Sequence, residues 1–339
     1  MAGDEIVIRT TSLVLCIMLS VMLFMPAASA DRPSVNTMEQ MEKHIDSLLN
    51  DMTLDEKIYQ LFIVTLEVVA GVDKATKATK ATQIGLAATP VGGMIYFSVN
   101  IQNKVQITEM IANSQTFAKD RHGIGLFIAV DEEGGSVVRV AGKLKTNKLD
   151  SMRTIGRHGD LNEAYSVGKT IAQYISPLGF NLNFAPVADV NIDGKNTEIG
   201  SRSFGDDPVL VADMAVQVMK GLTENGVMAT LKHFPGHGST FGNSHYGKSI
   251  SSRTLSQMEQ AELLPFIKGI AAGAECIMIS HLTAVEIDSE YPASLSKTVV
   301  TGLLRERLGY DGLGCSENES NLGKILICRS IRFGTGSRC

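Results

Sequence analysis

The sequence contains no tryptophan, and aromatic residues make up only 6% of its 339 residues. Because aromatic side chains line wide grooves for long polysaccharides, this composition argues weakly against such a groove. The chain also lacks a block of basic residues, and its formal net charge is -5. We therefore expect no nucleic-acid partner.

Cysteine is scarce as well, with five in the chain. Cys276 lies in an apolar run and is expected to be a buried small hydrophobe. Three others, Cys315, Cys328 and Cys339, crowd the end of the chain. They match no metal-binding spacing, and no disulfide framework spans the sequence.

The first thirty residues differ in composition from the rest. An apolar run over residues 11–30 ends in Ala28-Ser29-Ala30, which is typical of a secretory signal peptide cut before Asp31. We expect an exported protein, periplasmic or extracellular, without membrane contact after cleavage. Because Arg9 is the only basic residue at the front, an uncleaved membrane anchor is the alternative. No other stretch approaches the ~20 apolar residues that span a bilayer.

From there to residue 313 the chain repeats one theme, in which a short apolar run is followed by an amphipathic helical stretch. The predicted strands are residues 60–64, 92–97, 125–133, 181–190, 227–234, 274–282 and 310–316. Helices are predicted between them, for example at 162–175, 208–225 and 256–272. Continuous apolar strands alternating with helices indicate a parallel sheet covered on both faces. We therefore predict an α/β fold, a (β/α)8 barrel of the TIM type.

The end of the chain does not follow this pattern. After Leu313 the sequence shows no clear strand–helix unit, so the eighth unit is expected to be missing. A barrel without its last strand would leave two unpaired edges. The lysine-spaced repeat at residues 74–82 is interpreted as a solvated loop insertion.

Polar residues gather where the predicted strands end, and in a barrel these ends converge on one mouth. They are Asp131, Glu132, Glu133 and Arg139 after the third strand, Asp189 and Arg202 after the fourth, Lys232 and His233 after the fifth, and Ser280 and His281 after the sixth. Each has a structural alternative: Asp189 can cap a turn, and His281 can be a hydrogen-bonded core histidine.

Several of these segments together resemble glycoside hydrolase family 3, in its branch of bacterial β-N-acetylhexosaminidases. The resemblance is carried by "KHFPGHG" (232–238) with the later "SH" (244–245), by "DEEGG" (131–135) followed by an arginine, and by "GSRSFG" and "MTLDEK". It covers roughly residues 38–313 and implies a catalytic barrel over 31–313, with 314–339 as a divergent tail.

The resemblance implies retaining hydrolysis of terminal β-linked N-acetylhexosamine through a glycosyl-enzyme intermediate. It implies His245 on a glycine-rich loop as the general acid/base, a task that suits a pKa near neutrality. His237, inside the motif, is expected to shape the loop. The implied sugar-binding residues are Asp131, Arg139, Arg202, Lys232 and His233. The implied partner is an N-acetylglucosamine-containing oligosaccharide or cell-wall fragment, and the chemistry needs neither a cofactor nor a metal. The oligomeric state is left open.

Two departures from the family pattern affect the expected chemistry. Asn243 occupies the position of an aspartate that pairs with the catalytic histidine, so the charged imidazolium loses electrostatic support. Glu317 stands where the nucleophilic aspartate is expected. It attacks the anomeric carbon in one interpretation. In the other interpretation, which is favoured, the tail past Leu313 is truncated or out of frame. The other reading frames of the gene would reveal such a frameshift.

Activity is accordingly expected to be impaired, and two rival functions remain. One is a family 3 enzyme with β-glucosidase specificity, which the "KHFPGHG" segment disfavours. The other is a sugar-binding pseudoenzyme, because the implied binding residues are intact while the residues of the chemical step are altered.

Overall fold

The computed structural model describes residues 35–146, 148–192, 194, 196–240, 249–320 and 323–329. Eight of its strands form a closed barrel in the order β1-β2-β3-β4-β5-β7-β9-β10, with β10 returning to β1. Their bounds are β1 Phe62–Thr65, β2 Gly93–Ile95, β3 Phe127–Val130, β4 Leu182–Asn183, β5 Met228–Phe234, β7 Cys276–Ile279, β9 Leu313–Ser320 and β10 Gly323–Arg329. All seven predicted strands are present, and the predicted barrel is confirmed.

The closure of the barrel differs from the prediction. Strands β1 to β9 pair with their neighbours in parallel. Strand β10 instead runs antiparallel to both β9 and β1, so a hairpin fills the eighth position. Within the described residues the eighth position holds no strand–helix unit, as predicted, but the prediction of two unpaired edges is wrong. The sequence basis is the apolar run at residues 325–328, which forms the centre of β10.

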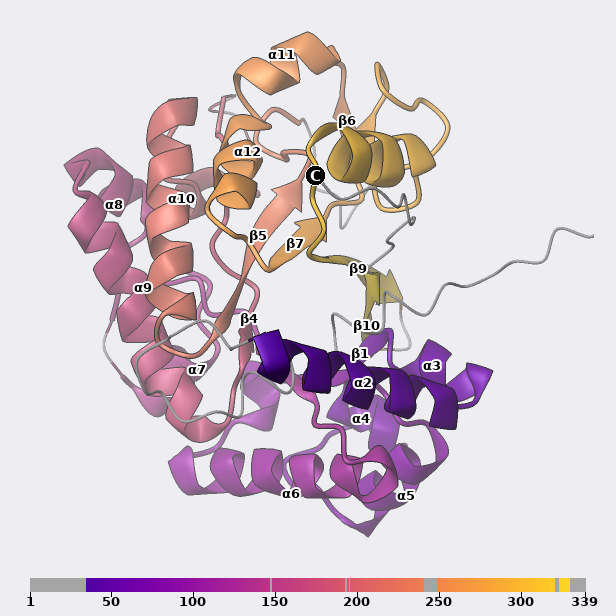
Figure 1. The fold of residues 1–339 in the computed structure, drawn as a ribbon. Helices are drawn as coiled ribbons and strands as arrows, with labels where there is room; N and C mark the ends of the chain where they lie inside the picture. The colour runs from indigo at the N-terminus through magenta and orange to yellow at the C-terminus, as the bar shows by residue number, and fades with distance from the viewer. Residues whose placement is uncertain are drawn as a thin grey trace, which may run out of the picture.

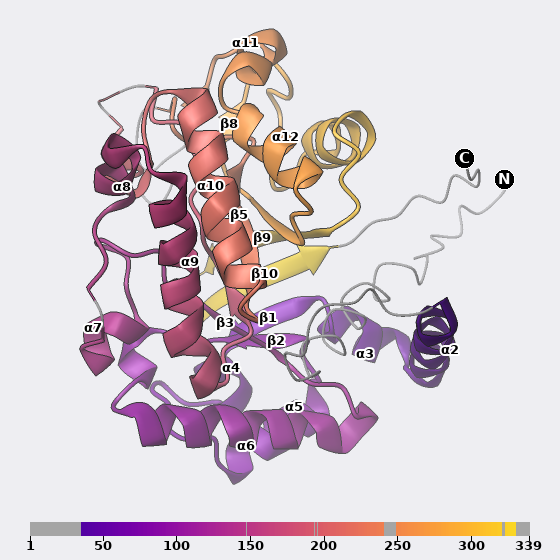
Figure 2. The same cartoon turned by 60° about the vertical axis from the view of Figure 1, so that its left-hand side comes forward.

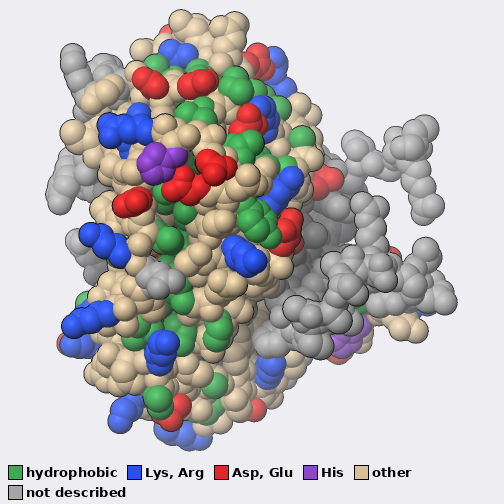
Figure 3. Space-filling view, turned by 90° about the vertical axis from the view of Figure 1, so that its left-hand side faces the viewer, with side chains coloured by type: hydrophobic (Ala, Val, Ile, Leu, Met, Phe, Trp, Pro, Cys, Tyr) green, Lys and Arg blue, Asp and Glu red, His purple; other side chains and the backbone are tan. Residues whose placement is uncertain are grey.

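Helices cover the barrel from outside (Figures 1 and 2). The α-helices are α2 Val35–Asp51, α3 Leu54–Tyr59, α4 Leu66–Ala70, α5 Lys80–Ala88, α6 Lys104–His122, α7 Val140–Leu144, α8 Met152–His158, α9 Leu161–Ile175, α10 Pro208–Thr223, α11 Leu255–Gln260 and α12 Leu264–Ala271. Three 3₁₀-helices are described, η1 Ser98–Asn100, η2 Ser176–Leu178 and η3 Gly200–Arg202. The element η4 Thr298–Arg307 is a π-helix. None of these described helices is long and apolar enough to cross a membrane. On the face formed by α8 and α10, charged groups of both signs are interspersed with small hydrophobic patches (Figure 3).

The core has two layers because strand side chains alternate between the two faces of the sheet. The barrel interior is filled by Ile63, Ile95, Phe127, Ala129, Leu182, Phe184, Met228, Cys276, Met278, Leu313 and Cys315. A larger layer packs between the strands and the helices. Cys276 is fully buried in the interior, as expected.

Two local predictions need correction. The predicted helix 256–272 is divided into α11 and α12, because Pro265 lacks the N–H that a continuous helix would bond to Ala261. The repeat at residues 74–82 is not wholly solvated. Its lysines are exposed, but Ala75 and Ala78 are buried in the core and residues 80–82 begin α5.

The segment that leads into the first strand begins with a capped helix. Thr53 and Glu56 make a capping box at the start of α3, with the Glu56 carboxylate accepting from the Thr53 N–H at 2.9 Å. A small two-stranded sheet, β6 Ile250–Ser251 with β8 Thr283–Ala284, lies beyond the carboxyl ends of β5 and β7. It therefore adds to the barrel on the side of the mouth.

Candidate active site

A cluster of four charged side chains lies at the mouth. Lys232, near the end of β5, places its Nζ 3.0 Å from Asp131 Oδ1 and 2.7 Å from Glu133 Oε1. Arg202 in η3 binds Glu133 through Nε and Nη2, at 2.9 and 2.8 Å. We call Asp131, Glu133, Arg202 and Lys232 the mouth cluster. Three of its members were predicted; Glu133 was not singled out.

The charges in the mouth cluster depend on one another. Burial alone would raise the pKa of Glu133, but Lys232 and Arg202 outweigh it and hold the pKa at about 2. Burial alone would lower the pKa of Lys232, whereas Glu133 and Asp131 raise it. Glu133 and Lys232 therefore stay ionised at neutral pH although both are almost fully buried.

His233 and Asp189 form a second arrangement beside the cluster. His233 Nδ1 lies 2.6 Å from Asp189 Oδ2, and the backbone N–H groups of His233 and His237 donate to Asp189 Oδ1 at 3.2 and 2.7 Å. Burial lowers the pKa of His233, and Asp189 opposes this shift only in part. The imidazole is then neutral at pH 7, with Nδ1–H donating to the carboxylate and Nε2 left as an acceptor.

Asp189 is therefore more than a turn cap. Burial would raise its pKa, but its interactions with His233 and His237 lower it. Its carboxylate fixes both the ring of His233 and the backbone that follows β5. His281 is not a core histidine: it is exposed, and its Nδ1 lies 2.7 Å from the Ser294 hydroxyl.

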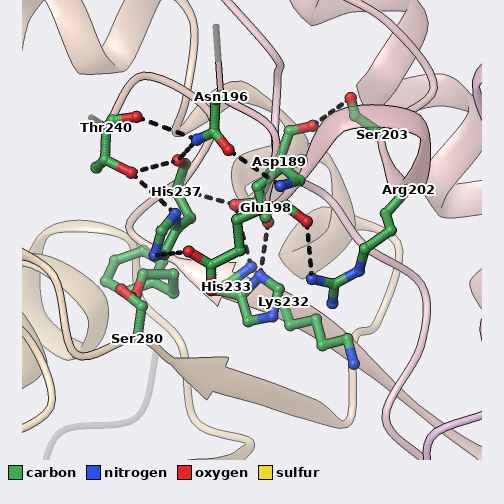
Figure 4. Close-up of polar contacts among 12 residues, drawn as sticks. Asp189, Asn196, Glu198, Arg202, Ser203, Lys232, His233, His237, Thr240 and Ser280 are labelled. Atoms are coloured by element: carbon green, nitrogen blue, oxygen red, sulfur yellow. Dashed lines mark hydrogen bonds and ion pairs between the residues drawn. The ribbon is translucent and has the colours of Figure 1, made fainter. Parts of the chain in front are cut away.

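His237 is tied into the loop by its own contacts (Figure 4). The Thr240 hydroxyl lies 2.9 Å from its Nδ1, and the Asn196 amide donates to its carbonyl oxygen at 2.8 Å. Its Nε2 is 3.9 Å from Glu198 Oε2. These contacts agree with the loop-shaping role expected of His237, and they place Glu198, which the sequence did not single out, beside the site.

Arg139 is not joined to the mouth cluster by any hydrogen bond or ion pair in the described part of the chain. It precedes α7, and its backbone N–H donates to Glu132 Oε2 at 2.7 Å. Its side-chain Nε is buried and has no hydrogen-bond partner among the described residues. The proposed contact of Arg139 with sugar therefore stays a prediction.

The predicted acid/base residues His245 and Asn243 lie outside the described residues. The backbone of Glu317 is described within β9, directly after Ser316, whose partner in β7 is Ile279. Ile279 also pairs with Phe234 of β5, so Glu317 follows at the level of the mouth. Among the described residues, no group of three or more histidine, cysteine or acidic side chains is arranged to hold a metal ion.

Fold and site together define a (β/α)-barrel protein whose polar cluster is built on the carboxyl ends of the strands, as in enzymes of this architecture. The family can be stated more closely. The model of the glycosyl hydrolase family 3 N terminal domain matches residues 53–331, and the chain belongs to this family.

Curated relatives carry the name beta-hexosaminidase. That of Chromobacterium violaceum is 36% identical over 241 residues, covering 69% of this chain and 65% of the relative. Beta-hexosaminidase A of Pseudoalteromonas piscicida is 35% identical over 239 residues, covering 66% and 40%. The chain thus spans less than two thirds of the length of these two relatives.

Solved structures agree with this assignment. A family 3 beta-N-acetylglucosaminidase from Paenibacillus sp. superposes with a TM-score of 0.70 at 32% identity, over 78% of this chain and 49% of that one. NagZ from Neisseria gonorrhoeae, in complex with N-trifluoroacetyl-D-glucosamine, superposes with a TM-score of 0.66 at 32% identity, over 71% and 70%. Both are similar to this chain over its barrel.

Proposed function

We propose that this protein hydrolyses terminal β-linked N-acetylglucosamine by a retaining double displacement. The observation that carries the proposal is the mouth cluster together with the His233–Asp189 pair. Buried, fully ionised carboxylates and cations at a barrel mouth make the charge-assisted hydrogen bonds that orient sugar hydroxyls. The names of the relatives support N-acetylhexosamine as the sugar.

In the proposed reaction, Asp131, Lys232 and His233 hold the hydroxyls of the non-reducing sugar. Arg139 and Arg202 complete the pocket, and Arg202 also keeps Glu133 in place. The Glu317 carboxylate attacks the anomeric carbon while His245 gives a proton to the departing glycosidic oxygen. Water then releases the sugar as His245 takes a proton back. The two departures from the family pattern predict a low turnover rate.

The second candidate is a sugar-binding pseudoenzyme. The observation that favours it is the contrast between the complete mouth cluster and the altered residues at positions 243 and 317. Such a protein would bind N-acetylglucosamine through the same groups and release no product.

One pair of measurements separates the candidates. Hydrolysis of a chromogenic N-acetyl-β-glucosaminide is compared with N-acetylglucosamine binding by calorimetry, and the matching β-glucoside tests the rival specificity. We expect slow cleavage of the N-acetyl substrate only. Binding without cleavage selects the pseudoenzyme. A protein that shows no binding and no cleavage would overturn both proposals.

We further propose that the protein is exported, on the basis of the apolar segment at residues 11–30 and its Ala28-Ser29-Ala30 end. Cell fractionation with N-terminal sequencing tests this. A mature N-terminus at Asp31 in the exported fraction is the expected result, and an intact N-terminus in the membrane fraction would select the anchor instead.

A further inference from the structure

Glu132 sits between two members of the mouth cluster, yet its side chain does not belong to that cluster. It is fully buried. Its carboxylate accepts from the backbone N–H groups of Arg139, Val140 and Ala141 at 2.7, 2.7 and 3.1 Å. It also accepts from the Tyr174 hydroxyl of α9 at 2.8 Å. Four donors from two helices thus converge on one carboxylate.

The backbone of Glu132 is held as firmly as its side chain. Its N–H donates to Asn183 Oδ1 at 3.0 Å, and its carbonyl oxygen accepts from Asn183 Nδ2 at 2.8 Å. Asn183 is a fully buried residue of β4. The amide therefore ties Glu132 to the neighbouring strand on both sides of its Cα.

This arrangement affects both neighbours of Glu132. In an extended chain, successive side chains point to opposite faces. With Glu132 fixed toward α7 and α9, Asp131 and Glu133 are both presented to Lys232. The same carboxylate fixes the backbone at Arg139, because it accepts from the N–H of this N-cap residue of α7.

We propose that Glu132 is a positioning residue for sugar binding, acting through Asp131, Glu133 and Arg139 without touching the sugar. The inference rests on the proposed function and adds a residue to it. The three N–H groups are the first of α7 and have no intrahelical acceptor, so a carboxylate is the group best suited to bind them. An amide would turn one acceptor atom into a donor facing these donors.

The test is the conservative substitution Glu132→Gln, with Tyr174→Phe as a milder second variant. Asp131 and Arg139 would contact non-reacting hydroxyls, so their displacement weakens ground-state and transition-state binding alike. We expect the Kd for N-acetylglucosamine and the KM of the chromogenic glycoside to rise about tenfold in Glu132→Gln, with kcat within about threefold of wild type. Tyr174→Phe removes one donor of four and should raise the same Kd about threefold.

Glu56→Gln is the matched control, because Glu56 is also a buried carboxylate that caps a helix through a backbone N–H. It lies in α3, before β1, and no hydrogen bond or ion pair joins it to the mouth cluster in the described part of the chain. It should lower the midpoint of thermal unfolding and leave Kd and KM unchanged, as a purely structural cap does.

If Glu132→Gln folds and binds N-acetylglucosamine with the Kd of wild type, the inference is overturned. If Glu132→Gln does not fold, Tyr174→Phe decides, and a wild-type Kd there overturns it equally. Wild-type protein that neither binds nor cleaves the sugar overturns the proposed function itself, which is a distinguishable result.

Discussion

Glu133 shows how a single residue depends on its neighbours. It is a buried carboxylate whose charge is held by the Lys232 ammonium at 2.7 Å and by two contacts from the Arg202 guanidinium. Removing either cation would leave buried negative charge without compensation. The cluster therefore links sugar binding to stability, because the same charges serve both.

The depressed pKa of Glu133 predicts a particular pH dependence of stability. The ordinary pKa is 4.5 and the folded value is about 2, so the stabilisation is complete above pH 4.5 and is lost as the pH falls toward 2. Over that window the free energy of unfolding should fall more steeply with decreasing pH for wild type than for Glu133→Gln. The difference in slope is expected to reach about 1.4 kcal/mol per pH unit. Urea unfolding at several pH values measures it, and parallel curves for the two proteins would contradict it.

At residue 243 the prediction concerns rate. Asn243→Asp restores a carboxylate two positions before His245 and should stabilise the imidazolium formed during turnover. We expect kcat to rise about tenfold or more with KM nearly unchanged, because the effect is confined to the chemical step. Steady-state kinetics on the chromogenic glycoside measure this. Equal or lower kcat would refute the histidine–carboxylate hypothesis, and Asn225→Asp, on the remote turn after α10, controls for added charge.

Among the elements, α9 and α10 approach each other closely through two glycines. A Cβ added at Gly168 would lie 2.1 Å from the Val218 carbonyl oxygen, and one added at Gly221 would lie 2.2 Å from that of Tyr165. No side chain fits at either position without separating the helices. This pair of helices forms the wall outside β5, the strand that carries Lys232 near its end (Figure 2).

Gly168→Ala should accordingly destabilise the protein by roughly 1–3 kcal/mol through overpacking. Gly302→Ala is the control, since a Cβ at that helical position meets nothing within 4 Å. It should be neutral or stabilise by up to about 1 kcal/mol, because alanine is favoured over glycine in helices. Chemical unfolding of both variants tests this, and similar losses in the two would disprove the packing argument.

The elements also show how far the sequence alone could predict the structure. Strands such as 227–234 were predictable because apolar runs buried on both faces end in polar residues. The direction of the Glu132 side chain, opposite to those of Asp131 and Glu133, follows from the alternation of side chains along an extended chain and is predictable from the sequence. The cluster partners were not predictable in the same way. Which carboxylate meets Lys232 depends on barrel curvature and strand register, which local sequence does not encode.

On the scale of the whole molecule, the barrel depends on β10 for its closure. The sequence alone does not predict this strand, because a regular eighth unit is a parallel strand with a helix, and the lone apolar run at residues 325–328 carries no such periodicity. Its pairing with both β9 and β1 leaves no open edge in the barrel as described.

A chain that ends at Ser320 would lack β10 and expose the edges of β1 and β9. We expect it to associate or precipitate and to unfold at a lower temperature than the full chain. A chain that ends at Arg329 keeps both strands and should behave like the full chain. Size-exclusion chromatography and thermal unfolding compare the three chains. If the chain that ends at Ser320 is monomeric and as stable as the full chain, β10 is dispensable.

The reversed direction of β10 also decides where the chain goes next. In a regular eight-unit barrel the last strand points toward the mouth. Here the Cα partner of Arg329 is Gly314, near the start of β9, so the described chain leaves on the opposite face of the barrel. A reporter domain or surface tether joined directly after Arg329 would thus start from the side away from Lys232 and His233. Immobilisation through that end should keep the mouth open to soluble sugars.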